Sequence, residues 1–270
     1  MKNNSVQNMS QQEIISAIEE NFTGFFRACV QIGQGDIYEE PELTWIFTGT
    51  PLTLFNGVFH TSLTLSDPEV TIEKVLNFYQ SRQQSMVWCV SPLTHPSDLS
   101  HRLTAHGLTP WRTVGMAIDL HKINESLPFP EGLVIERVQN EQTMREWVCT
   151  MARGFPMDEA GSLKLMANVP PLEHPAGPFY LARLNGEPVA TSALYCAEEV
   201  AGIYYMVCTG PSARQQGIRS AMTMTSLLDA RAMGYRMAIL QATPIGQPIY
   251  QRLGFTSYYT LDRYCWEPSN

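Results

Sequence analysis

The pattern of apolar and polar positions changes most clearly in the second half of the chain. Residues 203–208 form a short run with the β-branched and aromatic content of a buried strand. Gly210 and Pro211 interrupt the run, and a helical period begins at Gly217. One face of this helix carries Ile218, Ala221, Met222, Thr225, Leu228 and Ala232. The pattern predicts a strand, a tight turn and a helix that ends at Gly234, a residue suited to a left-handed cap.

The rest of this half also alternates between predicted strands and predicted helices. The spacing of apolar residues predicts helices at 142–153 and 249–253, and strands at 133–138, 179–184, 188–196 and 235–242. Asn185-Gly186 joins two of these strands and is a strong signal for a β-hairpin. Gly254 closes the last short helix, and a final strand ends near residue 267.

The first half shows a similar order of elements. An apolar stripe predicts a helix at 11–32, and Asp67-Pro68 opens a second helix that runs to Tyr79. A short helix capped by Ser97 or Asp98 ends at His106-Gly107. Strands are predicted at 43–48, 54–65, 86–90 and 115–120. The order strand, helix, strand, short helix, strand repeats that of residues 201–267, so we interpret the first half as a decayed copy of the second.

A break in composition separates the two copies. Residues 121–132 include Asn124, Pro128, Pro130 and Gly132, which favour an irregular connection. We therefore expect two domains, at 1–125 and 133–270, joined by a linker at 126–132.

The overall composition narrows the class of protein. The chain has 270 residues, of which 44% are hydrophobic, and a net charge of −8. A nucleic-acid-binding protein needs a basic surface, so this balance argues against that class. The six cysteines are scattered singly without metal-type spacing, and we expect them to be reduced in a cytoplasmic protein without a metal site. The N-terminus lacks the apolar core of a signal peptide, and no apolar run approaches the ~18–20 residues that span a membrane.

The turn between the strand at 203–208 and the following helix is a candidate anion site. A helix start presents several unpaired backbone N–H groups and the positive end of the helix dipole. Arg214 and Arg219 add positive charge there, so the natural ligand is a phosphate or pyrophosphate. The alternative is an ordinary strand-to-helix connection with solvated arginines.

Two motifs in this half resemble those of the GCN5-related N-acetyltransferase (GNAT) superfamily. The family's pyrophosphate motif, Arg/Gln-x-x-Gly-x-Gly/Ala, is matched by residues 214–219, and its Tyr-x-x-x-Gly-Phe element by residues 250–255. The resemblance implies an α/β (α+β) fold of tandem GNAT-like domains, each with a mixed, mostly antiparallel central sheet flanked by helices. Arg219 departs from the motif, because the family has a small residue there. Its side chain could crowd the cofactor, or point outward and give the cofactor an extra charge-assisted contact, which is the alternative we favour.

The resemblance also implies a reaction. GNAT enzymes move an acetyl group from acetyl-CoA to a primary amine by direct transfer in a ternary complex, so proximity supplies much of the rate. The cofactor-binding residues would be Met206, Val207, Cys208, Arg214, Gln215, Gln216, Gly217, Ile218, Arg219 and Ser220. Tyr250 matches the family's general acid, which protonates the departing thiolate. The alternative for Tyr250 is core packing beside Phe255.

The acceptor side is less defined by the sequence. Residues 154–178 form a long irregular segment, and in a GNAT-like fold this region lies over the acceptor site. We expect Phe155, Asp158 and Glu159 near the substrate, or else a surface loop with an acidic tip. Glu198 and Glu199 are further candidates for the general base, as are Asp158, Glu159 and a chain of water molecules.

The first copy lacks the motifs of the second. Its strand passes into a helix through residues 65–69, where Asp67 and Glu69 would repel a pyrophosphate, and Leu103 takes the place of Tyr250. We expect this copy to have a structural or substrate-shaping role, or alternatively to hold a second ligand.

These observations lead to one preferred function and two alternatives. The preferred function is acetylation of a small amine or peptide, in a monomer or homodimer; the tandem arrangement is similar to acetyltransferases that protect producers from amine-bearing or polyamine antibiotics. The first alternative is a protein N-terminal or lysine acetyltransferase. The second is a non-catalytic module that binds acyl-CoA and regulates a partner.

Overall fold

A computed structural model of the chain describes residues 6, 9–32, 35–50, 52–154, 177–197, 199–208 and 216–268, and of residues 32 and 205–208 the backbone alone. The first half contains α1 (Gln11–Ile32), β1 (Asp36–Glu40), β2 (Leu43–Phe47), η2 (Thr53–Phe55), β3 (Gly57–Thr61), α2 (Pro68–Gln80), β4 (Met86–Val90), α3 (Leu99–Ala105), β5 (Thr109–Asp119) and η3 (Leu120–Lys122). The second half contains β6 (Leu133–Arg137), α4 (Glu141–Gly154), β7 (Phe179–Leu184), β8 (Glu187–Ala197), β9 (Val200–Cys208), α6 (Ile218–Ala232), β10 (Met237–Ala242), α7 (Gln247–Leu253) and β11 (Thr256–Trp266).

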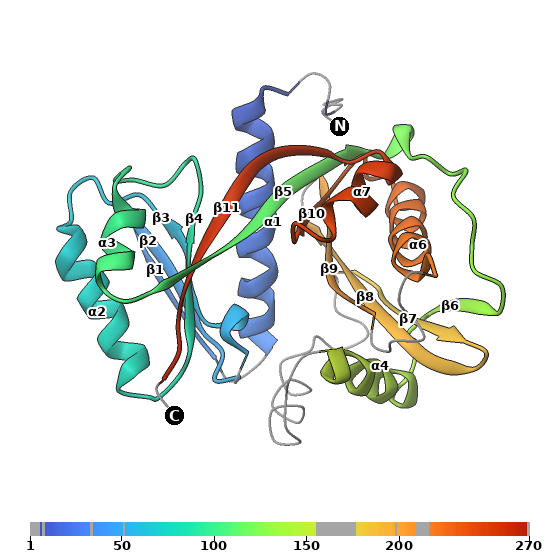
Figure 1. Cartoon of the computed structure of the whole chain (residues 1–270), viewed down its shortest axis with the longest axis horizontal. Coiled ribbons are helices and arrows are strands. Elements are labelled where there is room, and N and C mark those ends of the chain that lie inside the picture. The colour runs from blue at the N-terminus through green and yellow to red at the C-terminus, as the bar shows by residue number, and fades with distance from the viewer. Residues whose placement is uncertain are drawn as a thin grey trace.

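All the strands join in one continuous sheet that crosses both halves of the chain (Figure 1). Its order is β1-β2-β3-β4-β11-β5-β10-β9-β8-β7-β6. Only the β3–β4 and β9–β10 pairs are parallel, and the other neighbours are antiparallel. The predicted mixed, mostly antiparallel sheet flanked by helices is therefore confirmed.

The last strand of each half pairs across the centre of the sheet. β5 ends the first half but pairs with β10 of the second, from Val114↔Ala242 to Asp119↔Met237. β11 ends the second half but pairs with β4 of the first, through Arg263↔Cys89 among others. The two long strands also pair with each other, and Figure 1 shows them crossing between the halves. The domain boundary at 126–132 stays a prediction. The strands before and after it belong to one sheet.

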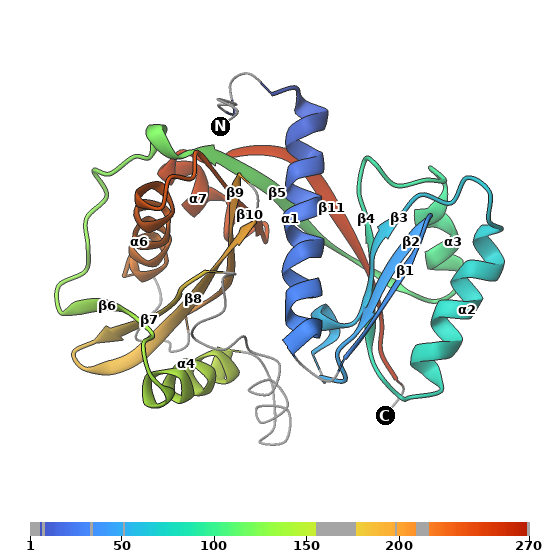
Figure 2. The same cartoon turned by 180° about the vertical axis from the view of Figure 1, so that it is seen from behind.

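The helices cover both faces of this sheet. The long helix α1 packs with α4 against one face, in a core that includes Ile18, Phe22, Phe26 and Trp147. The helices α6 and α7 cover the other face of the second half. In the first half, α2 and α3 pack against β2 and β4. Figure 2 shows α1 between the two halves, where it contacts strands from both.

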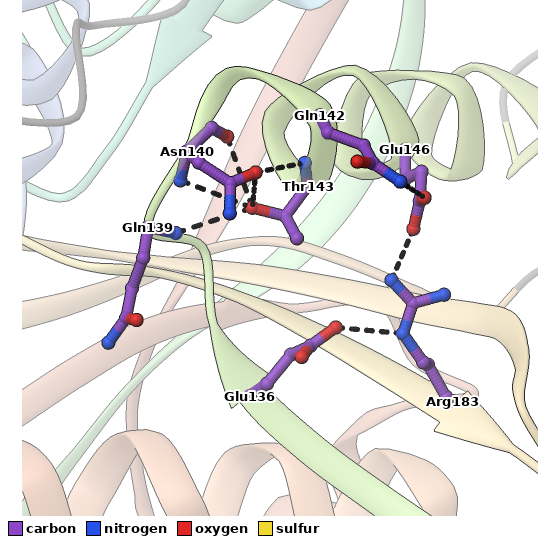
Figure 3. Close-up of polar contacts among 7 residues, drawn as sticks. All are labelled: Glu136, Gln139, Asn140, Gln142, Thr143, Glu146 and Arg183. Carbon is purple, nitrogen blue, oxygen red and sulfur yellow. Dashed lines mark hydrogen bonds and ion pairs between the residues drawn. The ribbon is translucent and has the colours of Figure 1, made fainter.

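Local hydrogen bonds fix the start of α4 (Figure 3). The Asn140 side chain accepts from the backbone N–H of Thr143 at 2.9 Å, and the Thr143 hydroxyl accepts from the backbone N–H of Asn140 at 3.3 Å. This reciprocal cap satisfies amides that a helix start leaves unpaired. Arg183 of β7 then bridges β6 and α4, because it contacts Glu136 at 2.8 Å and Glu146 as well.

Several predictions based on turn chemistry and apolar period are confirmed. Asn185 and Gly186 have φ values of 52° and 87°, as a two-residue hairpin of the mirror-image type I turn requires. Asp67 caps α2, since its side chain accepts from the backbone N–H groups of Glu69 and Val70. The predicted helix at 11–32 coincides with α1.

Other elements differ from their predictions. The expected strand at 54–65 is wrong in its first part, where η2 stands, and β3 begins at Gly57, whose φ is +139°. A Cβ atom at Gly57 would lie 1.7 Å from the Val87 carbonyl oxygen, so the close approach of β3 and β4 requires glycine. β5 starts at Thr109 rather than Gly115 because it pairs with β11 from Thr109 to Ala117. The acidic edge strand β1 was not predicted.

Candidate functional site

The strands β9 and β10 separate in the middle of the sheet. Their parallel pairing covers Met237↔Val200, Ala238↔Ala201 and Ile239↔Gly202. Beyond these positions both strands continue, β9 to Cys208 and β10 to Ala242, with no further pairing between them among the described residues. This divergence opens the sheet between the two strands.

A cavity of about 410 Å³ passes through the sheet at this opening. Ile203 and Leu240 belong to the core under α6 and α7, whereas the next residues, Tyr204 and Gln241, alternate to the α1 face. The wall of the cavity therefore includes residues from both faces of the sheet. Its wall consists of Phe22, Phe25, Phe26, Leu54, Phe55, Trp111, Thr113, Gly154, Ile203, Tyr204, Arg219, Leu240, Gln241, Thr243, Gly246, Tyr250 and Arg263.

Tyr250 lies in this wall on the α7 side. Its residue is 6% exposed and its ring meets that of Phe255 edge-on at 6.0 Å, so it packs in the core and lines the cavity at once. Burial raises the pKa of its hydroxyl, while the charge of Arg219 lowers it to a smaller extent. Within the described residues the hydroxyl has no hydrogen-bond partner. Tyr250 is thus a protonated phenol that can donate to a ligand in the cavity.

The start of α6 has the backbone that the motif requires. Gly217 precedes the helix with φ +78° and ψ 0°, a left-handed conformation that other residues rarely adopt. Ile218 is buried in the core and fixes the direction of the helix, while Gln216 is exposed and Ser220 is half-buried. The first amides of α6 are therefore held in place at the end of the opening, where an anion can accept from them.

Arg219 does not point outward as predicted. It is half-buried, and its Nη1 atom lies 3.2 Å from the position that a Cβ on Gly246 would occupy. The side chain follows the cavity wall towards α7, because the first turn of α6 faces the loop that carries Gly246. Its charge therefore acts on Tyr250 as well as on any anion at the helix start.

The other predicted residues are described in part or lie outside the described ranges. Met206, Val207 and Cys208 stand on β9 beyond the last pair with β10, where their backbone is not paired with that strand. Arg214, Gln215, Phe155, Asp158, Glu159 and Glu198 lie outside the described residues. Glu199 is exposed at the turn before β9, at the closed end of the strand pair, and does not line the cavity.

Arg263, Trp111 and Gln241 are among the residues of the cavity wall that were not predicted. Arg263 of β11 is 5% exposed, and its guanidinium lies 5.2 Å from the ring centre of Phe22 and 5.1 Å from that of Trp111. It donates to the side-chain oxygen of Gln241. These residues are far apart in sequence, so only the pairing of β11 with β5 and of β5 with β10 brings them together.

Glu19 was also missed. It stands on α1 beside a second, smaller cavity whose wall includes Phe22, Gln241 and Tyr259. Burial raises the pKa of its carboxyl to about 7, with a smaller contribution from Glu20 and an opposing hydrogen bond from Ser91. Glu19 follows Ile15 by four residues and precedes Phe22 by three, so it lies within the apolar stripe of the helix. The sequence alone therefore shows an acid at a position where burial is expected.

The corresponding helix start in the first half is already occupied. The Glu42 carboxylate accepts from the backbone N–H groups of Thr64, Leu65 and Ser66 at 2.6, 2.8 and 2.9 Å. It also accepts from the hydroxyls of Thr64 and Ser66, and these bonds lower its pKa to about 2. A side chain of the protein thus fills the place before α2 where a phosphate would bind.

The described ranges lack two features. They contain no group of three or more histidine, cysteine, aspartate or glutamate side chains placed to hold a metal ion. None of their helices combines the length and apolar character of a membrane span.

Comparison with known proteins agrees with this geometry. Residues 137–258 match the family profile described as an acetyltransferase (GNAT) domain. The chain is similar in structure to a GCN5-related N-acetyltransferase from Kribbella flavida, with a TM-score of 0.68 and 18% identity over 93% of this chain and 96% of that one. A GCN5-related N-acetyltransferase from Sphaerobacter thermophilus has a TM-score of 0.61 and 15% identity, over 87% and 76% of the two chains.

A tandem GNAT protein from the clavulanic acid biosynthesis pathway is also similar in structure. Its TM-score is 0.55 at 10% identity, over 84% of this chain and 79% of that one. No curated protein matches the sequence. Residues 137–258 therefore belong to the GNAT family of acetyltransferases, and the chain as a whole has the tandem GNAT fold.

Proposed function

We propose that this protein is an N-acetyltransferase that moves an acetyl group from acetyl-CoA to a primary amine of a small molecule or peptide, by direct transfer in a ternary complex. The observation that carries the proposal is the position of Tyr250. Its hydroxyl has no partner among the described residues and lines a cavity that crosses the sheet where β9 and β10 separate. Two substrates can meet there from opposite faces.

The residues at the opening fit acetyl-CoA. The amides at the start of α6, with Gly217 in its left-handed conformation, suit a pyrophosphate, and Arg219 supplies positive charge. Arg214, Gln215, Gln216, Ile218 and Ser220 complete the expected binding segment. At 206–208, β9 pairs with β8 but not with β10, so the edge that faces β10 is available to an extended amide chain such as pantetheine. When bound, acetyl-CoA supplies an activated acetyl group as a thioester.

Tyr250 then acts as the proton donor. Because burial raises the pKa of its hydroxyl, Tyr250 keeps its proton at neutral pH. From the cavity wall its Oη atom can transfer that proton to a departing thiolate, and the positive charge of Arg219 stabilises the phenolate left behind. The aromatic wall on the α1 face excludes water and positions the amine.

The first half takes no acetyl-CoA under this proposal. Its equivalent helix start is filled by the Glu42 carboxylate, and Asp67 accepts from the next two amides of α2. An incoming pyrophosphate would meet two negative charges and no free amide there. The role in self-protection against an antibiotic stays a prediction.

Calorimetric titration with acetyl-CoA, followed by an assay of thiol release with a panel of amines, tests the proposal. We expect one binding site in the full chain and thiol release with at least one small amine. Gly217→Glu should abolish binding by placing a charged side chain at the helix start. Gly186→Glu is the matched control, since Gly186 also has a positive φ, of +87°, but lies in the distant hairpin turn.

The outcomes separate the alternatives. Binding without thiol release from any amine or peptide would indicate the non-catalytic acyl-CoA-binding module. Release with peptides bearing a free N-terminus or lysine, but not with small amines, would indicate a protein acetyltransferase. Unchanged binding in Gly217→Glu would refute the assigned phosphate site.

A further inference from the structure

The α1 face of the cavity has the features of a separate chamber. On this face the wall is formed by Phe22 and Phe25 of α1, Trp111 of β5 and Tyr204 of β9, with Arg263 of β11 and Gln241 of β10 between them. Phe25 and Tyr204 stack at 4.1 Å with an angle of 4° between their rings. Tyr204 in turn donates to Asn21 at 2.8 Å, which fixes this wall to α1. A rigid aromatic wall favours a flat apolar ligand.

Arg263 is a buried charge in this chamber. Phe22 and Trp111 hold its guanidinium between their rings, and Gln241 accepts one of its hydrogen bonds. No carboxylate of the described residues forms an ion pair with it, and its Nε atom has no hydrogen-bond partner there. A buried guanidinium without a counter-charge is costly, and such a charge normally has a partner.

The neighbouring polar groups add to this excess of donors. The Nε2 atom of Gln241 and the Oγ1 atom of Thr113 are buried and, like the Nε atom of Arg263, have no partner in the described part of the chain. Nε of Arg263 and Nε2 of Gln241 can only donate, and the Thr113 hydroxyl can donate as well. The protein encloses these three atoms, so a ligand in the chamber meets the remaining part of the Arg263 guanidinium, and a carboxylate is the group that pairs best with a guanidinium.

The charge of the wall also favours a ligand with a negative group. Its described residues include two arginines, Arg219 and Arg263, and no acidic side chain. A polyamine would bring further positive charge to a wall that cannot balance it. A ligand with a negative group is therefore favoured over a polycation, although the protein as a whole has a net charge of −8.

Resting on the proposed function, we infer that the acceptor is an amine with an aromatic body and a carboxylate, which Arg263 binds in the chamber on the α1 face. The aromatic body lies against the stacked rings of Phe25 and Tyr204 and near the ring of Trp111. The amine points through the opening of the sheet, towards Tyr250. Aromatic amino acids and peptides that present such a group have this chemistry.

Binding of a non-reacting pair of compounds tests the inference without acetyl-CoA. The probes are 3-phenylpropionate and 3-phenylpropan-1-ol, which share the aromatic body and differ in charge; both are titrated into the full chain by calorimetry. We expect the carboxylate to bind at least about tenfold more tightly, as a charge-assisted pair implies. Equal affinity, tighter binding of the alcohol, or binding of neither compound would overturn the inference.

Variants locate the charge that is recognised. Arg263→Met should remove the preference for the carboxylate, and Arg263→Lys should keep part of it. Arg112→Met is the control, because Arg112 lies one residue from Trp111 on β5 but is exposed and pairs with Asp262. A preference that survives in folded Arg263→Met would overturn the assignment, and the wild-type comparison stands even if that variant fails to fold. Because no acyl transfer is measured, the result is independent of the thiol-release assay.

Discussion

Glu19 offers the sharpest test of how the core under α1 is packed. Its Oε1 atom is buried without a hydrogen-bond partner among the described residues, inside the helix that joins the two halves. Burial is the main reason that the pKa of its carboxyl rises from 4.5 to about 7. The substitution Glu19→Gln keeps the size of the side chain and removes its charge. It should therefore change stability in a way that depends on pH.

The sign and size follow from proton linkage. Below pH 4.5 the carboxyl is neutral in both states, so its ionisation does not affect stability. Between pH 4.5 and about 7 the unfolded chain releases the proton while the folded chain keeps it, so the free energy of unfolding falls as the pH rises. A shift of this size corresponds to a loss of about 3 kcal/mol once the pH exceeds 7. Glutamine cannot ionise and escapes this loss.

Urea unfolding of both proteins at pH 5 and pH 8.5 measures the effect. The stability of Glu19→Gln relative to the wild type should rise by about 2–3 kcal/mol between the two conditions. Glu73→Gln, an exposed change on α2, should show little such difference. A difference between wild type and Glu19→Gln that stays constant over this range would refute the reasoning, because the carboxylate would then be as well solvated folded as unfolded.

Three further changes test the site and the fold. Tyr250→Phe keeps the contact with Phe255 and should lower turnover by ~10²-fold or more with little change in acetyl-CoA affinity, and unchanged turnover would remove the role of proton donor. Glu42→Gln should lower the melting temperature at pH 7, and because the pKa of Glu42 is held at about 2, the difference should shrink as the pH falls below 4.5; a difference at pH 3 as large as that at pH 7 would contradict this. Deletion of residues 1–125 removes β5 and leaves β10 and β11 without their shared partner, so we expect insoluble protein, and a soluble, active second half would show that the first copy is dispensable.

Local chemistry made the turn before α6 and the short helix α7 predictable. The positive φ at Gly217 and the hairpin at Asn185-Gly186 depend on a few adjacent residues, and the sequence shows them directly. The short helix that carries Tyr250 follows from the same kind of signal, since Gly254 caps it with φ +109°.

The α1 face of the cavity was not predictable in this way. Arg263, Trp111 and Gln241 meet because three strands from both halves lie side by side in an order that crosses the middle of the chain. An arginine at position 263 within a strand of mixed polarity gives no local sign of burial. Arg263 pairs with Cys89 because β11, a strand of the second half, lies beside β4 of the first half. The spacing of apolar residues along the chain does not show which strands pair across the two halves.

The pairing of β5 and β11 across the two halves also suggests a role for the first half under the proposed function. β11 follows α7, which carries Tyr250, and then runs between β4 and β5 of the first half. Arg263 therefore stands in a wall that the second half alone cannot complete, because Phe22 comes from α1 and Trp111 from β5. Glu42 closes the vestigial helix start without leaving donors unpaired. Under the proposed function, the first copy serves as the wall of the acceptor chamber and as the partner that holds β11 in place.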